Sequence, residues 1–404
     1  MPRRLLLVST NYAPEHSGIG PYSAQIAEHL AEIGHEVHVL AGMPHYPAWR
    51  VDPDYRGAWR RTEQREGVTV HRRRHTVPAR QSALRRALYE ASFLAHAGMT
   101  APRGRFDLVL SQMPGLAGGL IGSRIARRTG VPHVTVVQDL MGAGAAQSGI
   151  AGGRQVAGAA SAVEARVLRT AALVGVVHET FRERVAAIGV PDRRIRVVPN
   201  WSHVAAPVAD RAETRARLGW REDETVLLHS GNMGLKQGLE VLVETARLAE
   251  RNVRVVLLGD GNQRAALEEA GRGLDRLEFL APVADADFPE VLAAADVLAV
   301  TQRASVLDMS IPSKLTSYFA AGRPVLASVA AEGGTAEEVL RSGAGVLVAP
   351  EDPRALLAAL LDLVADRGRV EALGAAGPRY VHDHLGRAAG LARVDALIAE
   401  ALGH

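Results

Sequence analysis

Short apolar runs recur along the whole chain, and a polar or amphipathic stretch separates each run from the next. Twelve of them have the length and aliphatic content of strands that are buried on both faces. They occupy residues 5–10, 36–40, 107–111, 134–138, 173–177 and 194–198 in the first half, and 226–230, 253–258, 277–280, 297–300, 325–329 and 345–348 in the second. This pattern predicts a parallel sheet in each half.

Helices are predicted between these strands. The first begins near Pro21, has apolar residues at a 3.6-residue period from Tyr22 to Ile33, and ends at Gly34. The others cover residues 84–96, 116–128, 156–169 and 180–188, or are centred near residues 243, 267, 292, 317, 338 and 360. Strands that alternate with helices in this way form doubly wound α/β domains.

The alternation stops at a polar linker near residues 199–212 and then starts again. We therefore expect two tandem Rossmann-like domains that face a cleft, residues 1–200 and residues 201–386. A length of 404 residues also favours two domains over a single hydrophobic core.

Residues 43–105 show no clear periodicity, and we expect an irregular region there. It contains a rigid aromatic loop from Pro44 to Trp49 and a helix with Leu84, Leu88, Ala91 and Ala95 on one face. Its arginines are clustered: Arg60, Arg61, Arg65, Arg72, Arg73, Arg74, Arg80, Arg85 and Arg86. Two interpretations stay open, a solvated basic face or a surface for an anionic acceptor or for a membrane that carries one.

Composition excludes several classes of protein. The net charge of +3 gives no indication of a nucleic-acid partner, and the absence of cysteine excludes disulfides, thiolate metal sites and a cysteine nucleophile. The first apolar run is too short for a signal peptide, and no run approaches the roughly 18 residues of a membrane span. We therefore expect a cytoplasmic protein, at most peripheral to the inner face of the membrane. We expect neither a metal nor a cofactor, and we interpret His133 as a core histidine.

Two segments of the second half are suited to binding phosphate. A crossover between strands 297–300 and 325–329 contains a helix that starts near Ser313 and Lys314 and ends at Gly322. The free N–H groups and positive dipole at a helix start attract anions. A second loop, 231–238, places Lys236 among glycines at a helix start, which suits a diphosphate.

The loop after the first strand resembles a dinucleotide-binding fingerprint only superficially. Gly18 and Gly20 come about eight residues after the strand rather than directly at its end, and strand 36–40 is not followed by the acidic residue that would bind a ribose. We therefore exclude NAD. The glycines still allow the backbone to approach a phosphate or a sugar closely.

Several ordered motifs together resemble the large family of retaining glycosyltransferases with the GT-B fold (family four), over nearly the whole chain. Within it, the chain is most similar to bacterial exopolysaccharide and O-antigen enzymes of the colanic acid type. The matching stretches are residues 11–15 with 18–20, 34–37, 44–47, 137–140, 199–201, 230–234 with 236–238, 312–314 and 320–324.

This resemblance implies that the second half binds a nucleotide diphosphate sugar (UDP, GDP or dTDP) and that the first half binds a saccharide, lipid-linked or small-molecule acceptor. Transfer would retain the anomeric configuration without metal, with the donor phosphate as the group that takes the acceptor proton. The family's phosphate lysine corresponds to Lys236, and its N-terminal glycine loop corresponds to Gly18 and Gly20. Residues 387–404 would form a final helix that crosses back to the first domain.

The candidate site combines the residue patterns with the resemblance. The candidate catalytic residues are Lys236, Lys314 and Asp308. Donor-binding candidates are Gly18, Gly20, Gly231, Asn232, Lys236, Leu280, Met309, Ser310, Ile311, Pro312, Ser313, Lys314 and Ser317. Acceptor-binding candidates are Glu15, His16, His45, Tyr46, Gln138 and Asp139.

The chain departs from the family pattern at four of these positions. Met309 and Ser317 occupy places where the family commonly has two glutamates, so that Asp308 becomes the candidate contact to the donor sugar. Asn232 replaces a common arginine, and Gln138 replaces a common histidine. Two alternatives therefore remain beside a glycosyltransferase: a nucleotide-sugar epimerase of the same architecture, and a non-catalytic subunit that binds nucleotide sugar.

Overall fold

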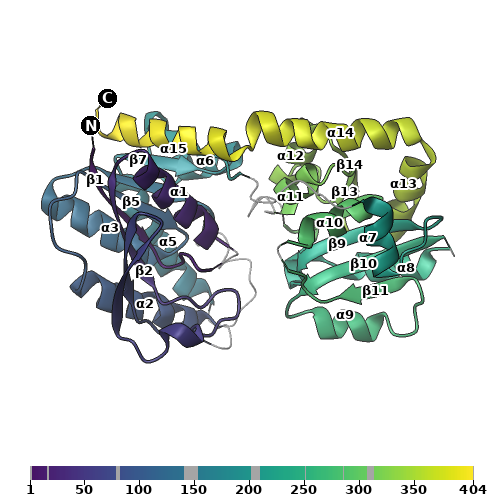
Figure 1. Ribbon diagram of the computed structural model, residues 1–404, viewed down its shortest axis with the longest axis horizontal. Coiled ribbons are helices and arrows are strands. Elements are labelled where there is room, and N and C mark those ends of the chain that lie inside the picture. Colours follow the sequence, from purple (N-terminus) through teal and green to yellow (C-terminus); the bar gives the residue numbers. More distant parts are fainter. Residues whose placement is uncertain are drawn as a thin grey trace. The chain divides into compact units, whose positions relative to one another are not determined.

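The computed structural model describes residues 2–15, 18–78, 82–140, 153–201, 210–250, 252–284, 286–306 and 314–403. The chain forms two compact units (Figure 1). Unit 1 comprises Met1–Asn200 together with Gly390–His404, and unit 2 comprises Trp201–Ala389.

Unit 1 is built on an eight-stranded sheet in the order β3-β4-β2-β1-β5-β6-β7-β8, in which only β3 runs antiparallel to its neighbour. The strands are β1 (Arg4–Ser9), β2 (Glu36–Gly42), β3 (Arg60–Arg65), β4 (Val68–Arg73), β5 (Leu108–Met113), β6 (His133–Val137), β7 (Leu173–Val176) and β8 (Ile195–Val197). The helices are α1 (Gly20–Glu32), α2 (Ala83–Met99), α3 (Leu116–Thr129), α5 (Gly153–Thr170), α6 (Glu179–Ala187) and α15 (Arg387–Ala401), with short 3-10 turns η1 (Pro53–Tyr55) and η2 (Asp192–Arg194).

Unit 2 contains a six-stranded parallel sheet in the order β11-β10-β9-β12-β13-β14. The strands are β9 (Thr225–Asn232), β10 (Val253–Asp260), β11 (Leu277–Leu280), β12 (Val297–Thr301), β13 (Val325–Ser328) and β14 (Gly345–Val348). The helices are α7 (Arg211–Leu218), α8 (Glu240–Leu248), α9 (Arg264–Ala270), α10 (Phe288–Ala294), α11 (Lys314–Ala320), α12 (Gly334–Ser342), α13 (Pro353–Ala365) and α14 (Arg367–His384), with the 3-10 turn η3 (Leu235–Gln237).

Successive residues of the central strands enter opposite cores, which explains why the strands appear in the sequence as unbroken apolar runs. On β9, Val226 and Leu228 join one hydrophobic cluster, whereas Leu227 joins the other. Helices therefore cover both faces of the sheet, and the predicted fold class of two doubly wound α/β units is confirmed. His133 is also a core residue as expected, with its Nε2 2.9 Å from Ser111 Oγ.

The prediction of an irregular region at residues 43–105 is wrong, because β3 and β4 form a hairpin that extends the sheet through β2. Val68 and Val70 alternate toward the core as in an ordinary strand, but Arg72 follows at the next inward position. A buried arginine hides the alternation that would have identified the strand. Two helices were also missed: α7, which begins at the end of the predicted linker, and α14, which follows the helix centred near residue 360.

Two of the clustered arginines are structural rather than solvated. Arg72 is fully buried, with its Nε 2.6 Å from Glu63 Oε1 and its guanidinium 4.9 Å from the centre of the Tyr55 ring. Arg73 is buried as well and donates to the carbonyl and hydroxyl of Thr100. The interpretation of the whole cluster as one basic surface is therefore wrong at these two positions.

The face of α2 that the sequence marked as apolar points outward. Leu84 is 70% exposed and Leu88 52%, and Ala91 and Ala95 are exposed too. The buried side of the helix carries Tyr89, Phe93 and Ala97 instead. Within the described residues, no helix has the length and apolar character needed to cross a membrane.

Candidate functional site

The candidate site of unit 2 lies where β9, β10 and β12 end, beside the start of α11. These strands are adjacent and parallel, so their carboxyl ends share one edge of the sheet (Figure 1). Ligands of open α/β sheets bind at this edge. The chain has two lysines, Lys236 and Lys314, and both follow strands of this sheet.

Lys314 is the first residue of α11, and its amine is buried against the end of β9. Its Nζ lies 3.0 Å from His229 Nε2. Burial lowers the pKa of this amine from its ordinary value of 10.5 to about 7. A buried cation that is close to its pKa at neutral pH is suited to an anionic ligand, because such a ligand would stabilise the charged form.

His229 fixes the position of this amine, and sequence analysis missed it. The ring is buried on β9, and its Nδ1 lies 3.2 Å from the carbonyl oxygen of Ala299. A carbonyl only accepts hydrogen bonds, so Nδ1 carries the proton and Nε2 accepts from Lys314. Burial and the neighbouring lysine hold the pKa of His229 well below its usual range, which keeps the ring neutral. His229 could have been recognised from the sequence as a single histidine inside the apolar run 226–230.

Glycines keep the space above β9 and β10 free of side chains. Gly231 has φ +107°, and a Cβ there would lie 3.8 Å from Lys314 Cε. A Cβ at Gly259 would collide with the carbonyl of Gly231, and one at Gly261 would collide with the backbone of Met233. The N–H of Met233 donates to the Asp260 carbonyl at 2.8 Å, which locks the two loops together. Backbone and the Lys314 amine therefore line this edge.

Lys236 lies in η3, within the glycine-rich loop that follows β9, and it is exposed. Its carbonyl accepts a hydrogen bond from the Arg303 N–H at 3.0 Å, and Gly238 ends the turn with φ +57°. The backbone of the loop is thus fixed while the lysine side chain extends into solvent. Asn232 is also exposed and folds over Gly234, where a Cβ would lie 2.8 Å from its Nδ2.

The other donor candidates are spread over this unit. Ser317 is buried on α11, and the hydroxyl of the next residue, Tyr318, accepts a hydrogen bond from the Ser230 N–H at 2.7 Å, which ties α11 to β9. Leu280 ends β11, and its carbonyl accepts from Arg264 at 3.1 Å. The candidates Asp308, Met309, Ser310, Ile311, Pro312 and Ser313 lie outside the described residues.

In unit 1, three acceptor candidates meet beyond the ends of β1 and β2. The buried carboxylate of Glu15 accepts hydrogen bonds from the N–H groups of His45 at 2.8 Å and Tyr46 at 2.9 Å, and from the Asn11 amide at 2.9 Å. Burial raises its pKa, against the effect of these donors. Glu15 thus holds the 43–46 loop in place through Oε1, while its Oε2 accepts from Asn11. His16 lies outside the described residues.

His45 is buried and neutral. Its Nδ1 donates to the carbonyl of Met43 at 2.9 Å, and its Nε2 lies 3.3 Å from the Tyr89 hydroxyl. Burial lowers its pKa to about 4. Both ring nitrogens therefore have partners within the protein, as the oxygens of Glu15 do, and this arrangement positions a loop rather than transferring protons.

The glycines of the first loop pack against the same cluster. A Cβ at Gly18, where φ is +69°, would lie 3.0 Å from the Tyr46 ring, and one at Gly20 would lie 3.0 Å from Glu15 Cβ. Gln138 and Asp139 are half-buried after β6, two strands away from β1 at the same edge of the sheet. The acceptor candidates of unit 1 thus form one compact group and a separate pair.

Comparison with known protein families matches both halves of the chain to glycosyl transferase domains. Residues 17–201 match the glycosyl transferase 4-like domain, and residues 224–366 match the glycosyl transferases group 1 domain. The chain is 32% identical to WcaI of Escherichia coli (strain K12), a glycosyl transferase assigned to colanic acid biosynthesis, over 88% of this chain and 91% of that protein.

Solved structures share the fold. Sucrose-phosphate synthase from Thermosynechococcus elongatus has a TM-score of 0.76 at 21% identity, over 98% of both chains. Anabaena Alr3699/HepE in complex with UDP has a TM-score of 0.72 at 16% identity, over 98% of this chain and all of that one. The family matches and the WcaI similarity show that the chain belongs to the glycosyltransferases, and its two α/β units have the GT-B fold.

Proposed function

We propose that the protein transfers a sugar from a nucleotide diphosphate sugar to a saccharide or lipid-linked acceptor, with retention of the anomeric configuration. Unit 2 would bind the donor and unit 1 the acceptor. The observation that carries this proposal is the buried Lys314 amine at the edge of β9, beside the glycines that leave room for a ligand. The choice of donor class follows HepE, which was crystallised with UDP and with UDP-glucose.

The proposed reaction breaks the bond between the anomeric carbon and the diphosphate oxygen, so negative charge develops on the leaving diphosphate. Lys314 would stabilise that charge by donating hydrogen bonds from a desolvated site. Lys236 would contribute through its exposed side chain. The acceptor oxygen bonds to the anomeric carbon on the same face, and its proton goes to a phosphate oxygen of the donor.

The test is a calorimetric titration of the full-length protein with UDP, GDP and dTDP. We expect one nucleotide to bind, and we expect Lys314→Met to weaken it by about 10- to 100-fold, as for the loss of a charge-assisted hydrogen bond. Arg217→Met, an exposed cation on α7 paired with Asp287, is the matched control and should bind like the wild type. Unchanged affinity in Lys314→Met would overturn the role of Lys314.

Product analysis beside the titration separates the rival functions. Nucleotide binding without sugar transfer to any acceptor would favour a non-catalytic subunit, whereas isomerisation of a donor sugar without any acceptor would identify an epimerase. The described residues of unit 1 give the epimerase little support, because Glu15 and His45 use their polar atoms to hold the loop at residues 43–46.

We further propose that unit 1 rests on the inner face of an anionic membrane. Helix α2 has an outward apolar stripe of Leu84, Leu88, Ala91, Ala95 and Met99, which lies opposite its buried side. Exposed cations flank it, Arg85 on the helix and Arg103 beyond its end. An apolar stripe with basic flanks is typical of helices that lie in a lipid interface.

Vesicle sedimentation tests this contact. Leu84→Glu with Leu88→Glu should abolish binding to vesicles that contain phosphatidylglycerol, because the apolar stripe is interrupted and anionic charge is added. Leu340→Glu on α12 of unit 2, where the leucine is 60% exposed, is the control. Equal binding of all three proteins would refute the contact. Arg72 and Arg73 are unsuitable for such a test because both are buried.

A further inference from the structure

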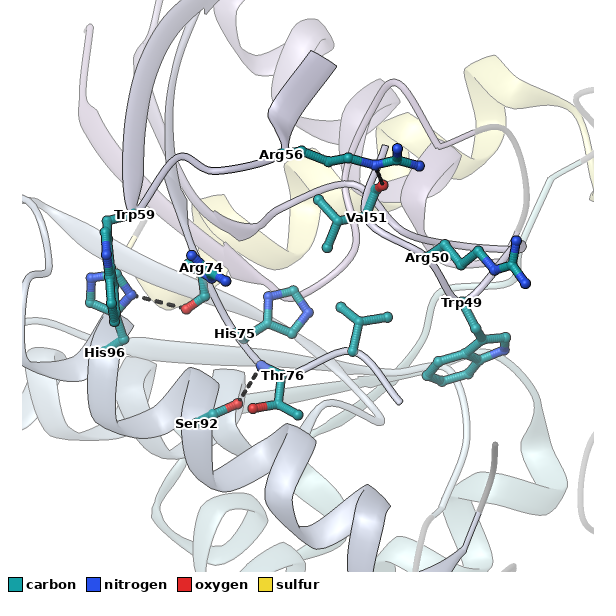
Figure 2. A pocket seen from close by; sticks show the side chains of 11 residues that line it. Trp49, Arg50, Val51, Arg56, Trp59, Arg74, His75, Thr76, Ser92 and His96 are labelled. Atoms are coloured by element: carbon teal, nitrogen blue, oxygen red, sulfur yellow. Dashed lines mark hydrogen bonds between the residues drawn. The ribbon is translucent and has the colours of Figure 1, made fainter. Parts of the chain in front are cut away.

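A pocket of about 680 Å³ lies in unit 1 between α2, the loop after β2 and the ends of the β3–β4 hairpin (Figure 2). It is lined by Trp49, Arg50, Val51, Arg56, Trp59, Arg74, His75, Thr76, Val77, Ser92 and His96. The pocket adjoins the acceptor candidates, because the ring of Trp49 contacts those of His45 and Tyr46 edge-on.

The pocket is positively charged. Its lining includes Arg50, Arg56 and Arg74 but no aspartate or glutamate. Within the described residues, none of these three arginines forms an ion pair. Nearby arginines outside the lining differ, since Arg61 pairs with Glu63 and Arg86 with Glu90. Unpaired guanidinium groups around a pocket favour an anion, and their planar N–H donors match a phosphate.

The indole rings of Trp59 and Trp49 lie at opposite ends of the pocket in Figure 2, with Arg74 beside Trp59 and Arg50 above Trp49. Trp59 is 67% exposed, although the Arg74 guanidinium lies 5.4 Å from its ring centre and His96 meets it edge-on. Trp49 is half-buried and held by its aromatic neighbours. Large flat apolar surfaces beside hydrogen-bonding groups are suited to the C–H face of a sugar ring.

A hydrogen-bond acceptor for sugar hydroxyls is also present. His96 Nδ1 lies 2.9 Å from the Arg74 carbonyl oxygen, so Nδ1 donates there and Nε2 is left for a sugar hydroxyl. Thr76 adds a hydroxyl, and its N–H is already fixed by Ser92 Oγ at 2.8 Å. Figure 2 shows both hydrogen bonds as dashed lines. They hold the backbone at Arg74 and Thr76 in place while the Thr76 hydroxyl and His96 Nε2 remain available.

We propose that this pocket binds a sugar that carries a phosphate or diphosphate. The arginines would donate hydrogen bonds to the phosphate, and the tryptophan rings would pack against the C–H face of the sugar. The proposal rests on the proposed function, because the bound sugar phosphate would be the acceptor or its reducing end. Two sources share this chemistry: a free sugar phosphate and a saccharide linked through diphosphate to a lipid. The apolar stripe on the outer face of α2 could accommodate only the second.

The experiment measures quenching of tryptophan fluorescence in the full-length protein without donor. The probes are glucose 1-phosphate, a short-chain polyprenyl diphosphate glucose, and neutral glucose. We expect a phosphorylated probe to bind and glucose to bind at least tenfold more weakly. A much higher affinity for the polyprenyl compound identifies the lipid-linked source, and equal affinities identify the free sugar phosphate.

Substitutions of pocket residues test whether the phosphorylated probe binds in this pocket. Arg56→Met with Arg74→Met should weaken the phosphorylated probe by about tenfold or more, and Trp59→Leu should weaken it several-fold. Arg61→Met, on the same hairpin but paired with Glu63, should have no effect. All of these side chains are exposed, so the variants should melt at the wild-type temperature. The proposal is overturned if the double variant Arg56→Met with Arg74→Met binds the phosphorylated probe with wild-type affinity. It is also overturned if neither phosphorylated probe binds to the wild type.

Nucleotide titration in the same samples keeps the two proposals apart. If UDP, GDP or dTDP binds but the phosphorylated sugars do not, the pocket assignment fails and the proposed function stands. If the phosphorylated sugars bind in the pocket but no nucleotide binds, the donor assignment fails and the pocket remains a sugar-phosphate site.

Discussion

At the scale of single residues, the environment of Lys314 determines its chemistry. Among the described residues no carboxylate pairs with this buried amine, and its lost hydration explains why its pKa falls to about 7. The neutral His229 ring offers it one hydrogen bond and no counter-charge. Such a site should bind an anion more tightly when the lysine is protonated, so that binding and protonation are linked.

Nucleotide affinity should therefore depend on pH. As pH rises from 7 to 9, Lys314 loses its proton in the free protein, and we expect the affinity for the bound nucleotide to fall by as much as about tenfold per pH unit. Lys314→Met should bind weakly with little dependence on pH over this interval. Titration at pH 6, 7, 8 and 9 measures this, and parallel curves for both proteins would contradict the role of the buried amine.

The same shift has a consequence for stability. The folded pKa of Lys314 lies below its ordinary value of 10.5, so between about pH 7 and 10.5 the unfolded chain binds more protons than the folded one. The contribution of this residue to the free energy of unfolding therefore increases as pH rises through that window. Denaturant unfolding at pH 7 and 9 should show a smaller increase for Lys314→Met than for the wild type.

At the scale of elements, the position of α11 depends on close packing against α14. Gly377 lies on α14, and a Cβ there would come 2.5 Å from the carbonyl oxygen of Phe319 on α11. Gly374 of the same helix similarly approaches the backbone of Gly322. These glycines allow the two helices to touch and so support the segment that carries Lys314. Gly322 itself ends α11 with φ +68°, as its place in the sequence predicted.

Gly377→Ala should therefore destabilise unit 2 and weaken nucleotide binding. Overpacking of this kind costs about 1–3 kcal/mol, or several degrees in melting temperature. Gly368→Ala is the matched control on the same helix, because it is exposed and a Cβ there would only touch the Asp366 side chain. It should be neutral or slightly stabilising, since alanine favours helix over glycine. Scanning calorimetry compares the two, and equal melting temperatures would refute the packing argument.

At the scale of the whole molecule, the chain ends in unit 1 although its preceding helix, α14, belongs to unit 2. Val394, Leu397 and Ile398 of α15 are buried there, and Leu397 lies against Gly175 of β7. Asp395 also meets His29 of α1 at 2.8 Å. The buried side of α15 is therefore part of the core of unit 1, which residues 1–200 alone would leave open.

Leu397→Ala should destabilise unit 1 by about 2–5 kcal/mol, because it leaves a cavity against β7. Leu361→Ala, on α13 of unit 2 and 42% exposed, is the control and should cost much less. Hydrogen exchange measures the effect locally: the amides of Val174 and Val176 should lose protection in Leu397→Ala, whereas those of β9 should not. Equal loss in both units would show that they unfold as one.

The sequence by itself determined all the strands except β3 and β4, and also the α/β class and the family. Strands of a parallel sheet are buried on both faces, so they form continuous apolar runs that can be recognised without knowledge of their neighbours. Turn glycines such as Gly34 and Gly322 are recognisable for a similar reason, because a positive φ is a local requirement. The same local pattern failed for β4, where a buried arginine occupies an inward position.

Only the tertiary structure decided the charge states and the pocket. The pKa of Lys314 depends on its burial beside His229, which is 85 residues away in the chain. Likewise, Arg72 and Arg74 look alike in the sequence but have different environments. Arg72 is buried, pairs with Glu63 and contacts the Tyr55 ring, whereas Arg74 is exposed and lines a pocket. Desolvation and ion pairing are set by side chains from distant segments, and no local pattern of residues contains that information.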